Sequence, residues 1–195
     1  KGMSEIILIN PPVTKPAEPP AGLARLCGAL RARGIVHAAV DLNIEGLLHL
    51  MGNAGDRARN SGDKRTARAL KNHDRNLALV RGAGALRNFD SYKKAVLELD
   101  RLVSRSNSLP GINLGLADYE NKFLSPLSST DLLEAARDHE NSPFFPFFRE
   151  RLSGLLKQTR YAGISVNYLS QALGAFAIAG YIRAGFPEVK IIMGG

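Results

Sequence analysis

The sequence predicts an α/β fold in which a parallel sheet is flanked by helices and carries a large, mainly helical insertion. Three observations predict this fold. Short runs of apolar and β-branched residues near both ends of the chain are typical of strands buried on both faces. These runs alternate with patterns of helical period, as in units of strand, helix and parallel strand. Between the two ends lies a long charged stretch of helical character without a convincing strand. Together they indicate a Rossmann-like (flavodoxin-like) sheet.

The N-terminal part predicts two strands and the helix that connects them. The first apolar run stops at Asn10, which is followed by two prolines that end a strand. Pro20 is well placed to open a helix, because proline fits the first helical position. Asp41 closes the second strand. In order, the predicted elements are a strand at 6–9, a helix from Pro20 to Gly34, a strand at 35–40 and a short helix at 44–51.

The middle of the chain, residues 52–159, is predicted to be the helical insertion. Ser129, Thr130 and Asp131 are plausible caps for one of its helices. Prolines interrupt its aromatic group, which is therefore expected to pack over an exposed edge and not to form an aromatic cage for a cofactor. The predicted helices cover 64–79, 91–103, 129–139 and 147–157, and the aromatic group is Phe144, Phe145, Phe147 and Phe148.

The C-terminal part resumes the pattern of strands and helices. It predicts a strand at 161–166, a helix at 171–184 that Gly185 caps, and a strand at 189–193. We expect both flanks, 3–51 and 160–195, to form one parallel sheet. The chain ends directly after a strand, without the helix that such a sheet normally needs next. A C-terminal domain is therefore expected but absent from this chain.

Composition limits the classes of function. The chain has 195 residues and 45% hydrophobic composition, enough for one ordinary core and a modest appendage. No apolar run approaches the roughly 18 to 20 residues of a membrane span, so a soluble cytoplasmic protein is expected. Cys27 is the only cysteine, which excludes an internal disulfide and a cysteine cluster for zinc or iron–sulfur. Lys1 and Gly2 precede Met3, the expected natural start.

The positive net charge is compatible with an anionic partner. The chain carries 26 Lys and Arg against 18 Asp and Glu, a formal net charge of +8. Residues 56–105 contribute 13 basic and 6 acidic side chains but few aromatic rings on which bases would stack. We interpret this stretch as a solvated helical face, and nucleic-acid binding is not expected.

Candidate binding residues follow the predicted strands. In an open parallel sheet, ligands bind outside the carboxyl ends of the strands, near the point where the strand order reverses. Small residues there allow a backbone to approach a ligand, and hydroxyl or amide groups supply hydrogen bonds. Each loop also has a structural explanation, as a strand stop, a helix cap or a chain turn. The candidates are Asn10, Pro11, Pro12, Asp41, Asn43, Gly46, Ser165, Val166, Asn167, Gly194 and Gly195.

Taken together, these loops resemble the cobalamin (B12)-binding domain of B12-dependent mutases, corrinoid methyltransferases and B12-binding radical SAM enzymes. The pattern of that family is D-x-H-x-x-G, S-x-L and G-G, in this order. Asp41, Gly46, Ser165 and the Gly194-Gly195 pair stand in matching places, whereas Asn43 replaces the histidine and Asn167 replaces the leucine. The opening stretches 7–12 and 19–26 resemble the radical SAM members specifically. The chain offers no G-x-G-x-x-G after its first strand and no Walker A loop.

The resemblance implies a cofactor-binding domain that is not catalytic alone. The whole protein would be a B12-dependent radical SAM enzyme, a methyltransferase, with S-adenosylmethionine and a 4Fe-4S cluster in the absent C-terminal barrel. Ser165 and the Gly194-Gly195 pair would line the channel for the nucleotide tail of cobalamin, and residues 10–12 with Asn43 would lie near the corrin. The alternative is a Rossmann-like binding module with a degenerate cofactor site, whose basic insertion contacts RNA or another anionic partner.

Asn43 gives the resemblance a specific consequence. An amide is a poor substitute for the imidazole that ligates cobalt in relatives with a histidine at this place. His37, His49, His73 and His139 do not fit the motif. We therefore expect cobalamin to bind with its own base displaced and without a protein histidine below the cobalt, which would ease reduction to nucleophilic cobalt(I). The structural alternative is that the Asn43 side chain caps the helix beginning near Ile44.

Overall fold

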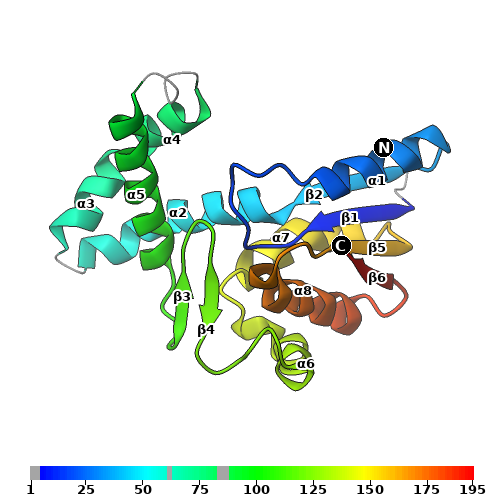
Figure 1. Cartoon of the computed structure of the whole chain (residues 1–195). Helices are drawn as coiled ribbons and strands as arrows, with labels where there is room; N and C mark the ends of the chain where they lie inside the picture. The colour runs from blue at the N-terminus through cyan, green and yellow to red at the C-terminus, as the bar shows by residue number, and fades with distance from the viewer. Residues whose placement is uncertain (1–4, 61–62, 83–87) are drawn as a thin grey trace.

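The computed structural model describes residues 5–60, 63–82 and 88–195 (Figure 1). Met3, the expected start, and residues 61–62 and 83–87 of the basic stretch lie outside the described residues. Four parallel strands form one sheet in the order β2-β1-β5-β6. Both flanks of the insertion therefore join a single sheet, and the predicted α/β fold is confirmed. The strands are β1 (Ile6–Asn10), β2 (His37–Asp41), β5 (Tyr161–Ser165) and β6 (Lys190–Gly194).

One face of this sheet carries the main core. Ile7 pairs in register with Ala162, and Ile9 pairs with Ile164, so all four side chains point to the same face. Each of them is at most 2% exposed. On the other face, Leu8 is buried but Ile192 of the edge strand β6 is 61% exposed. The two faces are therefore covered unequally.

Helices account for this difference between the two faces. Helix α1 (Ala21–Ala32) contacts β1 and β2, and the right-handed crossover that it forms puts it on the face of Leu8. The opposite face is covered by α2 (Leu42–Asn60), α7 (Phe145–Leu156) and α8 (Ala172–Gly185), and α7 contacts both of the others. A Cβ at Gly180 in α8 would overlap the carbonyl of Ala136, so glycine allows the close contact with the neighbouring helix α6 (Ser129–Arg137).

The predicted insertion contains two different parts. Helices α3 (Lys64–Lys71), α4 (His73–Arg81) and α5 (Phe89–Ser106) project from the sheet (Figure 1). Helix α6, the 3₁₀ helix His139–Asn141 and α7 instead lie against α8. Between the two parts is an antiparallel hairpin of β3 (Ile112–Leu114) and β4 (Tyr119–Asn121), which the sequence did not predict. Its strands of three residues are too short for a recognisable alternation of apolar and polar side chains.

Two further differences from the predicted elements have identifiable causes. The helix predicted over 64–79 is divided into α3 and α4 at Asn72, whose side-chain amide donates a hydrogen bond to Glu98 of α5. Helix α7 begins at Phe145, earlier than predicted, with Pro146 in its first turn, where proline is tolerated. Among the described residues, the helices are too short or too polar to cross a membrane.

The aromatic group lies in the core and not over an exposed edge. Phe144 and Phe148 are each 1% exposed, and Phe145 is also buried. The ring of Phe148 lies 5.4 Å from that of Phe145 and 5.6 Å from that of Tyr181 in α8. Packing was the correct expectation, but its predicted location was wrong. Phe145 and Phe148 pack against Tyr181 of α8. Phe144 and Phe147 lie beside Gly46 of α2.

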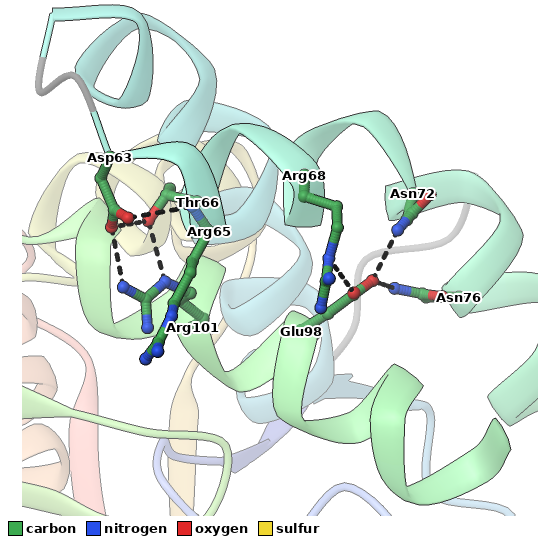
Figure 2. Close-up of polar contacts among 8 residues, drawn as sticks. All are labelled: Asp63, Arg65, Thr66, Arg68, Asn72, Asn76, Glu98 and Arg101. Carbon is green, nitrogen blue, oxygen red and sulfur yellow. Dashed lines mark hydrogen bonds and ion pairs between the residues drawn. The ribbon is translucent and has the colours of Figure 1, made fainter. Parts of the chain in front are cut away.

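Two polar networks hold the projecting helices together (Figure 2). The Glu98 carboxylate, 6% exposed, accepts hydrogen bonds from Arg68 Nε at 3.0 Å, Asn72 Nδ2 at 2.9 Å and Asn76 Nδ2 at 2.8 Å. In the second network, Asp63 accepts from the Thr66 hydroxyl at 2.6 Å and from Arg101 Nη2 at 2.8 Å. Helix α5 is thereby tied to α3 and α4 through side-chain charge.

Candidate functional site

The carboxyl edge of the sheet contains the point where the strand order reverses. The chain moves from β1 outward to β2 on one side, and later enters β5 on the other side of β1. The loops after β1 and β5 therefore diverge from neighbouring strand ends, which is where ligands bind in open sheets of this kind. The candidate residues lie around this point, but they fall into a group enclosed by the protein and a group that borders the surface.

The buried group begins with Asn10 at the end of β1. Its amide Nδ2 donates to Asp41 Oδ1 at 2.9 Å, across the neighbouring strand end. Gln171, which is fully buried, donates from Nε2 to Asn10 Oδ1 at 3.1 Å and to the carbonyl of Pro11 at 2.7 Å. These polar groups satisfy one another inside the protein, as buried polar groups must. Asn10 and Pro11 are therefore fixed parts of the fold and not open ligand contacts.

Asn43 fixes the loop that follows β1. Its Oδ1 accepts from the backbone N–H of Thr14 at 3.0 Å, and its Nδ2 donates to the carbonyl of Thr14 at 2.9 Å. The residue is 1% exposed. Asp41 caps α2 instead, since its Oδ1 accepts from the backbone N–H groups of Asn43 and Ile44 at 3.1 and 3.2 Å. Asp41 therefore caps α2, and the suggested capping by Asn43 is wrong.

The same loop is closed from the other side by the start of α8. Ser170 Oγ donates to the carbonyl of Val13 at 2.8 Å, and Val13 is fully buried. A Cβ at Gly174 would meet the carbonyl of the buried Pro12 at 2.5 Å. Gly46 has a packing reason too, because a Cβ there would lie 3.2 Å from the Phe144 ring. The loop 11–14 thus covers the edge toward α2 and α8.

A second group lies at the end of β5, and we call it the carboxyl-edge corner: Gly22, Asn167 and Gly194 are exposed, and Ser165 beside them is 7% exposed. A Cβ at Gly22 would lie 3.7 Å from Ser165 Oγ and 3.8 Å from Asn167 Oδ1, both ordinary contact distances. Asn167 Nδ2 donates to Ser165 Oγ at 3.2 Å. Gly194, opposite Ser165 in the sheet register, has open space at its Cβ position. The corner therefore presents small and polar groups from α1, β5 and β6.

Backbone contacts shape the far side of this corner. The N–H of Val166 donates to the carbonyl of Gly194 at 2.8 Å, which extends the pairing of β5 with β6. A Cβ at Gly195 would overlap the backbone of Val166, so a side chain at this position would push the two segments apart. The glycine pair thus has two roles: Gly195 allows close approach, and Gly194 leaves space beside Ser165.

A side-chain pair ties the loop before α1 to the loop after β5. The Tyr168 hydroxyl donates to Glu18 Oε2 at 2.6 Å. This hydrogen bond lowers the pKa of Glu18, more than its ion pair with Lys15 does, and it raises the pKa of Tyr168. The pair fixes the relative position of two exposed loops beside the corner.

Sequence reasoning missed Gly22, Thr14 and Gln171, which contact the candidate residues. The position of Gln171 could have been recognised, because this polar residue directly precedes a helix that is mostly apolar. Thr14 gave none. Within the described ranges, no three His, Cys, Asp or Glu side chains are grouped closely enough to hold a metal ion. Comparisons with protein-family models, curated proteins and solved structures found no match for this chain.

Proposed function

We propose that the carboxyl-edge corner binds the nucleotide tail of cobalamin, and that this chain is the cofactor domain of a larger radical SAM methyltransferase. One observation carries the proposal: the Ser165 hydroxyl stands beside two glycines, Gly22 and Gly194, at the reversal point of a flavodoxin-like sheet. The three residues come from segments far apart in the sequence. Backbone exposed at glycine and a fixed hydroxyl suit a ribose–phosphate group, which needs close approach and hydrogen bonds.

The residues present fit one part of the cofactor and not another. The corner suits the nucleotide tail, because Gly194 leaves space and Asn167 holds the Ser165 hydroxyl in place. Asn43 does not suit a contact with the corrin, because both ends of its amide bond to Thr14 and it is 1% exposed. In this proposal cobalamin binds without a ligand from residue 43, and Asn43 holds the loop 11–14 in shape.

The chemistry is divided between this chain and the rest of the proposed enzyme. When bound, cobalamin supplies a cobalt centre that accepts and donates a methyl group. The corner residues bind and orient it, and the ordered loop 11–14 excludes water from the strand ends. With one cysteine in the sequence, the chain lacks the thiolates for an iron–sulfur cluster. The proposal therefore assigns the cluster and S-adenosylmethionine to a separate barrel domain.

Titration with hydroxocobalamin tests the proposal on the chain as it stands. We expect the absorption spectrum of hydroxocobalamin to shift on binding, and the shift to saturate at one cofactor per chain. Gly194→Leu should fill the open space and weaken binding by at least about tenfold, equivalent to about 1.4 kcal/mol. Gly154→Leu is the matched control, since Gly154 also has open space at its Cβ position but lies in α7. Lack of binding by the folded chain, or equal binding by Gly194→Leu, would remove the support for this function.

Electron paramagnetic resonance of the cobalt(II) form tests the claim about residue 43. We expect no superhyperfine splitting from an axial nitrogen, because the cofactor base is displaced and no histidine replaces it. His49, which follows Asn43 in the sequence, lies against the Phe147 ring at 5.2 Å and contacts Asn53. A nitrogen splitting in the bound form would show that the base or a histidine ligates cobalt, and the histidine-free claim would then be wrong.

A second candidate function is the binding of RNA or another polyanion by the projecting helices. One hollow between α3 and α5 is lined by more basic than acidic residues, which favours an anionic partner: Arg65, Arg68, Lys94 and Arg101 against Glu98 and Asp100. Arg68 and Arg101 already form ion pairs within the chain, however. We expect no tight RNA complex. A micromolar complex that weakens steeply between low and physiological salt would favour this second function over the first.

A further inference from the structure

A separate apolar cavity lies between the projecting helices and the loop before α1. Its volume is about 450 Å³, within the range of roughly 300 to 1,000 Å³ that is typical of small-molecule sites. Helices α2, α4 and α5 form three walls, and the loops 15–17 and 116–117 form the rest. Its apolar lining includes Ile44, Leu48, Leu77, Val80, Val96 and Ala117.

The apolar walls are only partly covered by the protein itself. Ile44 is 38% exposed, and the other five side chains are half-buried. Behind them lie fully packed residues such as Leu47 and Leu99, which also contact the cavity and belong to the core. Apolar side chains from three helices that converge on one hollow without filling it are characteristic of a binding pocket, since scattered single exposures need no such explanation.

Polar groups in this cavity are few and have one sign of charge. The described lining residues include two cations, Lys15 and Arg81, together with the phenol of Tyr92, and they include no acidic side chain. Lys15 has an ion pair with Glu18 at 3.4 Å, but both are exposed, so solvent screens this pair. A ligand with an apolar body and an anionic end would match both the walls and the cations.

We infer that this cavity binds an amphipathic anion, a hydrocarbon chain that ends in a carboxylate or a phosphate. The hydrocarbon of the ligand lies along the walls formed by Ile44, Leu77 and Val96, and its binding removes apolar surface from water. The anionic end pairs with Lys15 and Arg81, while Tyr92 offers a hydroxyl donor. The cavity shares no residue with the carboxyl-edge corner, so this inference goes beyond the proposed cobalamin site and does not depend on it.

Calorimetric titration of the whole chain with dodecanoate, below its micelle concentration, tests the inference. We expect one dodecanoate per chain. Ala117→Trp fills the cavity and should weaken binding by at least about tenfold. Ala184→Trp is the matched control, because Ala184 is an exposed alanine near the end of α8. Dodecyl phosphate in place of dodecanoate shows which anionic end is preferred, and either preference supports the inference.

A charge test keeps the inference falsifiable if Ala117→Trp does not fold. The double variant Lys15→Met with Arg81→Met should bind dodecanoate about tenfold more weakly than the wild type. Its affinity for dodecanoate should then equal its affinity for dodecyltrimethylammonium. The control is the double variant Arg65→Met with Lys94→Met, in the hollow between α3 and α5, which should leave the affinity for both ligands unchanged. The inference is overturned if folded wild-type chain binds no dodecanoate, if the cationic detergent binds equally well, or if both the filling and the charge variants retain full affinity. Hydroxocobalamin titration of the same samples reports separately on the corner.

Discussion

The sheet core and the projecting helices of this protein differ in how much ionised side chains contribute to their stability. The core is built from apolar side chains such as Ile9, Ile164 and Phe148, all at most 2% exposed. The projecting helices also bury apolar side chains such as Leu99 and Leu102. In addition they depend on the carboxylates of Glu98 and Asp63, each of which joins α3 to α5. Hydrophobic burial does not depend on ionisation, whereas a network around a carboxylate does. The two regions should therefore respond differently to pH and to single substitutions.

The acidic networks also lower the pKa of their carboxylates. Burial by itself would raise the pKa of Glu98, but the hydrogen bonds from Asn76, Asn72 and Arg68 outweigh it, and the pKa is lowered. The Thr66 hydroxyl and the Arg101 guanidinium hold the pKa of Asp63 well below its usual range. Both shifts mean that the folded helices favour the ionised carboxylates, so protonation acts against folding in this region.

Excision of segments should show the largest difference between the two parts of the insertion. Removal of 107–159 takes away α6 and α7 and exposes the apolar surface of α8, so we expect the cooperative unfolding transition to be lost. Replacement of 63–106 by a short Gly/Ser linker should leave the four-stranded sheet folded. Circular dichroism during heating measures both. A cooperative transition after removal of 107–159 would contradict the assignment of α6 and α7 to the core.

Phe148→Ala should reduce the stability of the whole domain. It removes a ring that is 1% exposed and packs against Phe145 and Tyr181, and such cavities cost about 3 to 5 kcal/mol. Urea unfolding measures the loss, which should not change between pH 7 and pH 5. Phe123→Ala is the control, because Phe123 is 71% exposed. A loss below about 1 kcal/mol would mean that the ring is not part of the tight core.

Glu98→Ala should destabilise the projecting helices and leave the sheet protected. The change leaves three donors without their acceptor, including the buried amide of Asn76, at a cost of about 2 to 4 kcal/mol. Hydrogen exchange should show lost protection in α3, α4 and α5 while β1 and β5 stay protected. Glu134→Ala, whose side chain is 54% exposed, is the control. Equal loss of protection in the sheet would refute the separation of the two regions.

Acid should unfold the projecting helices before it affects the sheet core. The lowered pKa values of Glu98 and Asp63 contribute stability that is fully present above their ordinary values of about 4 and is lost as pH falls below them. Hydrogen exchange between pH 5 and pH 3 measures the loss. The Glu98→Gln variant should be less stable at neutral pH and less sensitive to acid. Simultaneous loss of protection in β5 would contradict this order.

The smallest effect is expected for Arg151→Met. Arg151 Nε donates to Glu45 Oε2 at 2.6 Å, a contact that joins α7 to α2, but both side chains are more than a third exposed. Exposed ion pairs contribute about 0.2 to 1 kcal/mol, which salt should reduce further. Urea unfolding at low and high salt measures it. A larger, salt-independent cost would indicate that Arg151 acts through packing.

The fold could be predicted from the sequence because buried parallel strands leave a strong local pattern. Residues 6–9 and 161–166 carry that pattern, and both lie in the single sheet. The hairpin at 112–121 could not be predicted, because its three-residue strands are too short to show an alternation of apolar and polar residues. The break at Asn72 could not be predicted either, because the hydrogen bond to Glu98 joins residues far apart in the chain. Local period indicates element type but not such tertiary contacts.

The sequence predicted the location of the candidate residues more accurately than their contacts. Ser165 and Gly194 do lie together at the carboxyl edge, as the strand order requires. Asn43 looked available from the sequence, because the partner of its amide, the backbone of Thr14, lies 29 residues away. The hydrogen-bonding groups of such a side chain are occupied by loop backbone, and a single sequence does not reveal which amides will be buried.

The pairing of β1 with β5 has a consequence for how quickly the domain reaches its native state. Ile6 is in register with Tyr161, so the two central strands are separated by most of the chain, while β1 and β2 are joined by one short helix. Bringing distant segments together costs closure entropy before any contact compensates for it. We expect β1, α1 and β2 to assemble early, and refolding after dilution from urea to be limited by the late arrival of β5 at the middle of the sheet.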